Sequence, residues 1–265
     1  MQRKNVFDFS IKMSIIEYMQ HEIVPASLVD SIAGLKHGGT FKCLKVLLRH
    51  KLVHHDGKKY DGYRLTTLGY DFLAIRALTA RGSIAAVGRQ IGVGKESDVF
   101  EVVDDEGNVM ALKLHRLGRT SFRAVKSKRD YVKRGNHFSW LYLSRLAALK
   151  EFAFMKALGD NGLPVPEAIE CNRHAVLMSL VIGYPMVQVK EFMHAKQVYT
   201  DCIKILVRLA QLGLVHCDFN EFNLLVSCHR SCFLLYLVTL FSIYTENKNR
   251  IIMRNKSTTS KTNAD

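Results

Sequence analysis

The chain has 265 residues, of which 48% are hydrophobic and 23% are charged, an ordinary balance for one or two domains with their own cores. Its 38 lysines and arginines outnumber its 24 aspartates and glutamates, which gives a formal net charge of +14. This excess favours an acidic partner, which can be nucleic acid, an anionic membrane or a nucleotide.

The composition argues against secretion and against a membrane span. The six cysteines include no CxxC pair, and the first residues lack the charged-then-apolar layout of a signal peptide. The most apolar run, Phe233–Tyr244, has about half of the roughly 20 residues that a spanning helix needs. We therefore expect no membrane contact, and a cytoplasmic location with shuttling to the nucleus.

Residues 1–20 carry no usable signal, whereas residues 21–80 begin with two predicted helices. Apolar positions from Ile23 to Leu35 are typical of an amphipathic helix that starts at His21, tolerates Pro25 in its first turn and is closed by Gly38–Gly39. A second helix from Phe41 combines an apolar stripe with a basic face. That basic face consists of Lys42, Lys45, Arg49 and Lys51.

A basic hairpin follows these helices, with strands at 52–55 and 60–66 joined by a turn at 56–59. A helix, a basic helix and a hairpin make a winged-helix domain. Such a domain commonly places its second helix in a nucleic-acid groove. The charge favours nucleic acid as the partner, and a winged helix that contacts only proteins is the alternative.

Three antiparallel strands are predicted next, at 84–91, 97–103 and 109–114. The connection between the first two is rich in glycine. Gly92 and Gly94 allow the backbone to approach a phosphate without a Cβ in the way, and Lys95 and Ser97 can add donors. An ordinary hairpin turn is the alternative interpretation.

A lysine lies inside the apolar third strand. Lys113 shares a strand face with Val109 and Ala111 and therefore needs an anion. A long helix predicted at 139–158 offers Glu151 on its apolar stripe. A pair of Lys113 with Glu151 matches the lysine and helix carboxylate that orient ATP phosphates in kinases, and two side chains that reach the surface independently are the alternative.

The segment from His115 to Arg134 is strongly basic. It predicts a mobile loop, either a contact for phosphates or a merely solvated stretch. Strands at 168–170 and 175–182 then complete a five-stranded sheet. The second of these ends at Met178–Leu180, where a kinase hinge offers backbone groups to adenine, so Met178 and Leu180 are predicted to bind ATP.

The most specific pattern follows a helix predicted at 198–212. His216, Asp218 and Asn223 reproduce the H-x-D-x-x-x-x-N spacing of a kinase catalytic loop. In such a loop the aspartate receives the hydroxyl proton or is itself phosphorylated, and the asparagine holds a metal. Apolar strand residues flank the pattern, which occurs in the expected order after the glycine turn and Lys113.

Several longer stretches resemble the RIO family of atypical protein kinases, and two of them resemble its winged-helix-bearing branch. The family resemblance lies in Gly92–Asp98, Ala111–Arg123, Trp140–Leu146 and His216–Asn223, and the branch resemblance in His21–Pro25 and Leu35–Gly39. The resemblance covers roughly residues 21–226. Two departures are Cys217, where the family usually has glycine, and Ser179, which replaces the usual hinge glutamate.

The predicted elements and the resemblance together indicate an α+β protein in four parts after residue 20. These are a winged helix at 21–80, a kinase-like N-lobe with an antiparallel five-stranded sheet at 81–182, a partial C-lobe with the catalytic loop at 183–226, and an atypical, disordered tail at 227–265.

The function that the resemblance implies is an ATP- and Mg²⁺-dependent serine/threonine kinase or ATPase. It would bind the pre-40S ribosomal particle and its rRNA during small-subunit maturation. Lys113 would bind ATP phosphates, Glu151 would hold Lys113, Asp218 would be the catalytic aspartate and Asn223 a magnesium ligand.

The sequence departs from a kinase after Val226. A kinase carries a second metal-binding aspartate on the strands after the catalytic loop, yet residues 224–265 contain no aspartate except Asp265 and no glutamate except Glu246. We interpret the tail as foreign to the fold, from a retained intron or a truncated gene model, and expect impaired catalysis. A non-catalytic rRNA-binding module with a nucleotide-sensing cleft and an unstable fragment are the alternatives.

Overall fold

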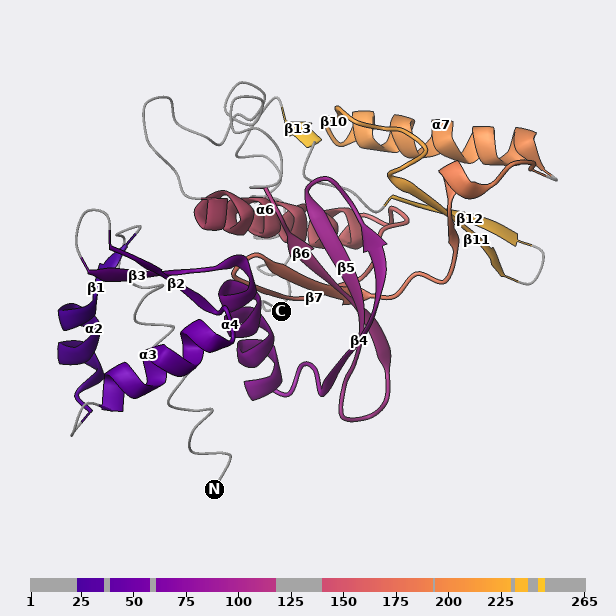
Figure 1. Cartoon of the computed structure of the whole chain (residues 1–265). Coiled ribbons are helices and arrows are strands. Elements are labelled where there is room, and N and C mark those ends of the chain that lie inside the picture. The colour runs from indigo at the N-terminus through magenta and orange to yellow at the C-terminus, as the bar shows by residue number, and fades with distance from the viewer. Residues whose placement is uncertain are drawn as a thin grey trace, which may run out of the picture. The chain divides into compact units, whose positions relative to one another are not determined.

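The structure is a computed structural model that describes residues 23–35, 39–57, 61–117, 140–192, 194–229, 232–237 and 243–245 (Figure 1). Contacts between residues divide the chain into two compact units. The first unit comprises residues 1–146 and 171–175, and the second comprises residues 147–170 and 176–265.

The first unit opens with a winged helix, as predicted. Its elements are β1 (Val24–Pro25), α2 (Ala26–Ala33), α3 (Gly39–Arg49), β2 (Val53–Asp56), β3 (Gly62–Leu65) and α4 (Thr67–Ala80). The three strands form an antiparallel sheet in the order β1-β3-β2. The predicted basic helix and hairpin are therefore confirmed as α3 and β2–β3.

The prediction for the first helix was wrong at both ends. Val24 and Pro25 pair with β3 as a short strand, so α2 begins only at Ala26. It ends at Gly34, which has a φ of 58° and donates its N–H to the carbonyl of Asp30. Glycine adopts this left-handed conformation at low cost, so Gly34 stops the helix well before Gly38.

Helix α4 was not predicted. Thr66 caps it, because its side-chain oxygen accepts a hydrogen bond from the Gly69 N–H at 3.1 Å. The threonine just before an apolar stretch was the available sequence signal. The helix buries Tyr70 and Leu73 and also the carboxylate residue Asp71, which is only 8% exposed.

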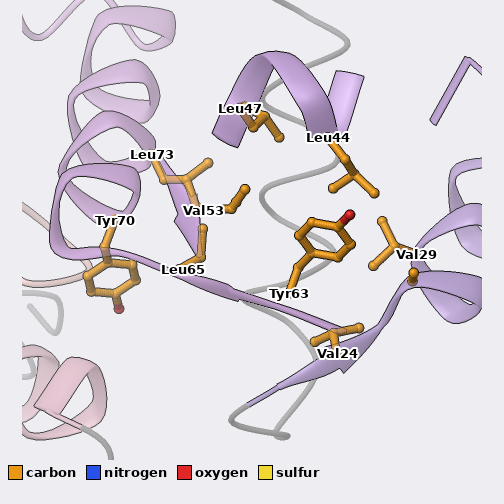
Figure 2. Close-up of a cluster of buried hydrophobic side chains, with 10 residues drawn as sticks. Val24, Val29, Leu44, Leu47, Val53, Tyr63, Leu65, Tyr70 and Leu73 are labelled. Carbon is orange, nitrogen blue, oxygen red and sulfur yellow. The ribbon is translucent and has the colours of Figure 1, made fainter. Parts of the chain in front are cut away.

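One apolar cluster holds the winged helix together (Figure 2). Leu44 and Leu47 of α3 face Tyr63 and Leu65 of β3 across this core, and Leu73 of α4 closes it on another side. Further members are Val24, Ala26, Val29, Val53 and Tyr70. Basic residues Lys42, Lys45, Arg49 and Lys51 are exposed, so α3 has one face in the core and one basic face in solvent.

The five-stranded sheet is confirmed. Its strands are β4 (Ala86–Val93), β5 (Ser97–Val103), β6 (Val109–His115), β7 (Ala168–Asn172) and β8 (Ala175–Ser179), in the order β4-β5-β6-β8-β7. Strands β4, β5 and β6 pair antiparallel. The predicted long helix is α6 (Trp140–Asp160).

The second unit contains the remaining elements. They are β9 (Tyr184–Pro185), a 3-10 turn (Met186–Gln188), α7 (Ala195–Gln211), β10 (Leu214–His216), β11 (Leu224–His229), β12 (Cys232–Leu237) and β13 (Ile243–Thr245). Strand β11 pairs antiparallel with β9 and with β12, and β10 pairs antiparallel with β13. Helix α7 buries Val198, Ile205 and Leu209, whereas Ile203 and Val207 on its other side are exposed.

The predicted disordered tail differs from the structure in its first part. Residues 227–229 complete β11, and β12 and β13 follow within the same segment. Backbone hydrogen bonding explains the difference, because each of these strands has a pairing partner. Strand β12 pairs with β11 in a hairpin, and β13 pairs with β10. Residues 246–265 lie outside the described residues.

No helix in the part of the chain that the structure describes is long and apolar enough to cross a membrane.

Truncation of a core leucine in α3 tests the winged-helix core. Leu44 is 1% exposed, so Leu44→Ala should lower the free energy of unfolding by about 2–5 kcal/mol. Phe41→Ala in the same helix is the control, because Phe41 is 50% exposed and its loss should change stability by about 0.5 kcal/mol or less. Urea unfolding can be followed by the fluorescence of Trp140, the single tryptophan, which packs against this core. Equal destabilisation by the two changes would contradict the core assignment.

Candidate functional site

The glycine turn and Lys113 lie on one face of the sheet in the first unit. Strand register pairs Gly92 with Val99 and Val99 with Lys113, so the three residues form a row across β4, β5 and β6. Lys113 is only 5% exposed. A buried ammonium group beside a strand that lacks a side chain at Gly92 is suited to a phosphate group.

The turn between β4 and β5 is tight. Gly94 donates its N–H to the carbonyl of Ser97 at 2.7 Å. A Cβ atom on Gly94 would lie 3.3 Å from that carbonyl oxygen, closer than most Cβ contacts, so glycine suits the turn. Lys95 at its tip is exposed and can reach an anion.

The remaining predicted nucleotide residues belong to the second unit. Glu151 of α6 is completely buried and Met178 of β8 is 5% exposed, while Leu180 is half-buried. Ser179 holds the hinge segment, since its hydroxyl accepts the Glu167 N–H at 2.9 Å and its own N–H donates to the Glu167 carbonyl at 3.0 Å. The pairing of Lys113 with Glu151 stays a prediction.

The catalytic-loop residues form a hydrogen-bonded set between β10 and β11. Asn223 donates its side-chain N–H to Asp218 Oδ2 at 2.9 Å and to the Asp218 carbonyl at 2.7 Å. Asn220 donates to Asp218 Oδ1 at 2.8 Å, and the Asp218 N–H donates to His216 Nδ1 at 3.2 Å. The Asp218 carboxylate is therefore held on both oxygens while its side chain remains exposed.

The same arrangement suits a hard cation. Asn223 uses its amide nitrogen on Asp218, which leaves its Oδ1 as an acceptor next to a carboxylate. Oxygen donors of these two kinds are the ligands that Mg²⁺ prefers. Residues Asp218 and Asn223 therefore fit a magnesium ion, and the contribution of Asn220 to holding Asp218 was missed in the sequence.

A close backbone approach supports the end of the loop. A Cβ atom on Gly183 would lie 2.8 Å from the Val226 carbonyl oxygen, so only glycine fits there without movement of the backbone. Ser227 donates its hydroxyl to the Ile182 carbonyl at 2.6 Å. The segment before β9 is thereby packed against β11, directly after Asn223.

Two protein-family models match this chain, one over its N-terminal part and one over most of the remainder. The RIO domain model matches residues 98–254, and the Rio2 N-terminal model matches residues 7–81. The chain belongs to the RIO family. The matched N-terminal model places it with the winged-helix-bearing branch, as the resemblance implied.

Individual relatives agree with this assignment. The chain is 56% identical over 207 residues to the serine/threonine-protein kinase rio2 of Dictyostelium discoideum, which covers 78% of this chain and 40% of that protein. It is 39% identical over 211 residues to the RIO-type serine/threonine-protein kinase Rio2 of Methanocaldococcus jannaschii, covering 78% and 77%. The crystal structure of the Rio2 kinase from Chaetomium thermophilum, an ADP/Mg²⁺-phosphoaspartate complex, superimposes with a TM-score of 0.78 at 42% identity, covering 93% of this chain and 75% of that one.

The RIO chain spans between 39% and 60% of the length of the first three curated relatives. The family match continues to residue 254, past the point where the tail was interpreted as foreign.

A buried ion cluster in the first unit of this RIO chain was not predicted from the sequence. Arg116, which was predicted to lie in a mobile basic loop, is only 6% exposed. Its guanidinium donates to Asp71 Oδ1 at 2.5 Å and Oδ2 at 2.7 Å and to Asp98 Oδ2 at 3.1 Å. His174 Nε2 lies 2.6 Å from Asp71 Oδ1. Residues 118–139, the rest of the predicted basic loop, lie outside the described residues.

The cluster determines the protonation of His174. Its Nε2 lies 2.6 Å from Asp71 Oδ1, and an ionised carboxylate can only accept, so Nε2 carries the proton and donates it to Asp71. Burial lowers the pKa of His174 against the opposing effect of Asp71, so the ring is neutral. Burial alone would raise the pKa of Asp71, but hydrogen bonds from His174 and Arg116, together with the Arg116 charge, lower it.

Both shifts predict acid lability of this unit. Because the folded pKa of His174 lies below its unfolded value, the unfolded chain binds the extra proton first, and stability is lost as pH falls below about 6.5. The lowered pKa of Asp71 acts in the same direction at lower pH. Between pH 7.5 and 5.5 the free energy of unfolding in urea should fall, by at most about 1.4 kcal/mol per proton over the one pH unit below 6.5.

His174→Gln should reduce this loss, since a glutamine amide can donate to Asp71 without titrating. His54→Gln, on the exposed face of β2, should leave the loss unchanged. An unchanged pH dependence in the His174 variant would contradict the assignment.

Proposed function

We propose that this chain is an ATP-dependent serine/threonine kinase or ATPase of RIO type. The observation that carries the proposal is the Asp218 carboxylate, which is held by Asn220 and Asn223 in the spacing of a kinase catalytic loop. Lys113, in one row with Gly92 and Val99, would hold the phosphates of ATP. Asn223 Oδ1 and Asp218 would hold Mg²⁺.

Bound ATP would supply the phosphoryl group, and Mg²⁺ held by Asp218 and Asn223 would neutralise its charge. Asp218 then either accepts the proton of a substrate hydroxyl or accepts the phosphoryl group itself, with release of ADP and later hydrolysis of the acyl phosphate by water. The name of the Chaetomium complex, which contains phosphoaspartate, favours the second course. The hydrogen bonds from Asn220 and Asn223 orient the carboxylate in both cases.

We further propose that turnover is slow. Residues 238–242, directly after β12, read Val-Thr-Leu-Phe-Ser and offer no carboxylate where a kinase carries its second metal ligand. With one carboxylate and one amide as metal ligands, the chain would bind Mg²⁺ and nucleotide more readily than it would transfer the phosphoryl group.

Magnesium-dependent ATP hydrolysis tests the catalytic assignment. Asp218→Ala should reduce the rate at least about 100-fold, because the group that accepts the proton or phosphoryl group is lost. Glu221→Ala is the matched control, an exposed carboxylate in the same loop, and should keep the rate of the unchanged protein.

Equal rates in the Asp218 variant and the unchanged protein would overturn this role. Binding of ATP without any hydrolysis would instead support a non-catalytic module whose cleft senses the nucleotide.

A second function is favoured by the exposed basic face of α3. We propose that Lys42, Lys45 and Arg49 contact the rRNA of the pre-40S particle, which the family resemblance suggests as the partner. Small-subunit maturation in the cytoplasm is the process that follows from this partner.

Binding of a structured RNA hairpin at several salt concentrations tests the RNA contact. The double variant Lys42→Glu with Lys45→Glu should weaken binding at least about tenfold and reduce the salt slope by about 0.9 for each phosphate that is no longer neutralised. Lys156→Glu with Lys196→Glu changes the net charge equally at exposed positions outside the winged helix and should have a smaller effect. If both double variants lose the same RNA affinity, only the net charge matters, and this result would contradict a winged-helix interface.

A further inference from the structure

Arg116 contacts three segments of the first unit. Its backbone N–H donates to the Glu96 carbonyl at 2.5 Å, in the glycine turn before β5. Its guanidinium donates to Asp98, the second residue of β5, and with both terminal nitrogens to Asp71 in the middle of α4. Two of these contacts therefore hold the start of β5, and the third reaches the winged helix.

Burial makes this set of contacts obligatory. The side chains of Arg116, Asp98 and Asp71 are 7%, 5% and 12% exposed, so little water is available to replace a missing partner. A planar guanidinium can serve two carboxylates at once, whereas a lysine ammonium is a point charge without this fixed fork. The geometry of Arg116 thus fixes both carboxylates in direction as well as in distance.

The contacts lie next to the proposed nucleotide residues in the sequence. Lys113 lies in β6, and Arg116 follows it by three residues, directly after the last residue of this strand. Asp98 directly follows Ser97, the first residue of β5. A shift of the guanidinium would therefore move the ends of both strands that carry the phosphate-binding row. The strand register of Val99 with Lys113 carries such a shift to Gly92.

The winged-helix side of the contact is equally well anchored. Asp71 lies between Tyr70 and Leu73, which both belong to the winged-helix core. Tyr70 stacks on His174 with ring centroids 4.6 Å apart, and the Leu73 carbonyl accepts a hydrogen bond from Arg173 at 3.3 Å. Helix α4 is thus fixed against the β7–β8 turn as well as against Arg116.

We propose that Arg116 is a positioning residue for the nucleotide, which ties the turn at 92–97 and the end of β6 to helix α4 of the winged helix through Asp71 and Asp98. The winged helix then supports the phosphate-binding turn in addition to any contact with RNA. The effect on nucleotide affinity rests on the proposed function, whereas the anchoring of the turn does not.

The experiment compares the whole chain with its Asp71→Asn, Arg116→Lys and Leu44→Ala variants. Asp71→Asn keeps the shape of the side chain and removes the charge on the α4 side, far from the turn in sequence. Leu44→Ala destabilises the same winged helix through its apolar core and leaves the ion cluster intact. Each protein is measured for urea stability, for Mg²⁺-ADP affinity and for hydrogen exchange of the amides at 92–97.

Asp71→Asn and Arg116→Lys should each weaken Mg²⁺-ADP binding at least fivefold and speed amide exchange at 92–97 at least tenfold. Leu44→Ala should leave ADP affinity within twofold of the unchanged protein, even where its loss of stability is as large or larger. A difference in ADP affinity between Leu44→Ala and the other two variants separates positioning of the turn from a general loss of stability. A general loss of stability would instead lower ADP affinity in all three variants.

Parallel losses of affinity and stability across all three variants would overturn the proposal, as would unchanged exchange at 92–97 in Asp71→Asn. If Arg116→Lys keeps the ADP affinity and the amide exchange of the unchanged protein, the planar guanidinium is not required. If the unchanged protein does not bind ADP, the proposed function fails, and the exchange measurement still decides whether Arg116 anchors the turn.

Discussion

The first unit depends on the burial of one guanidinium group between two carboxylates. A charge that is removed from water must find partners of opposite sign in good geometry, and one arginine meets that requirement for Asp71 and Asp98 together. Since Asp71 belongs to the winged helix and Asp98 to the sheet, the requirement fixes two domains to each other inside one compact unit. Apolar contacts add to this attachment, because Trp140 and Leu141 of α6 pack against the winged-helix core and Tyr70 of that core stacks on His174.

Hydrogen bonds and close backbone contacts organise the second unit around the catalytic loop. Both oxygens of Asp218 accept side-chain amides, and the segment at Gly183 approaches β11 so closely that a Cβ atom cannot be accommodated. Such contacts hold an exposed carboxylate in one orientation without burying it. An exposed yet oriented carboxylate is what a phosphoryl-transfer site requires, because its partner is a ligand and not another side chain.

The family assignment and the missing metal carboxylate point in different directions for catalysis. The RIO match extends through β12 and β13, so the chain continues the family pattern in this region. Residues 238–242, directly after β12, nevertheless offer no carboxylate that could join the proposed metal ligands Asp218 and Asn223. The residues that we propose for nucleotide binding, RNA binding and turnover lie in different parts of the chain, so the three proposed properties can be tested separately.

The sequence by itself determined the local elements and the chemistry that depends on spacing. Strand alternation and helical periodicity predicted α3, α6 and the five-stranded sheet, which the structure confirms, and the spacing of His216, Asp218 and Asn223 predicted a kinase-type catalytic loop, because both signals are confined to short windows. Only the tertiary structure decided that Arg116 is buried, since its partners Asp71 and His174 lie 45 and 58 residues away in the sequence. The strands within 227–245 were likewise decided by their pairing partners, because an extended segment becomes a strand only when another strand satisfies its backbone.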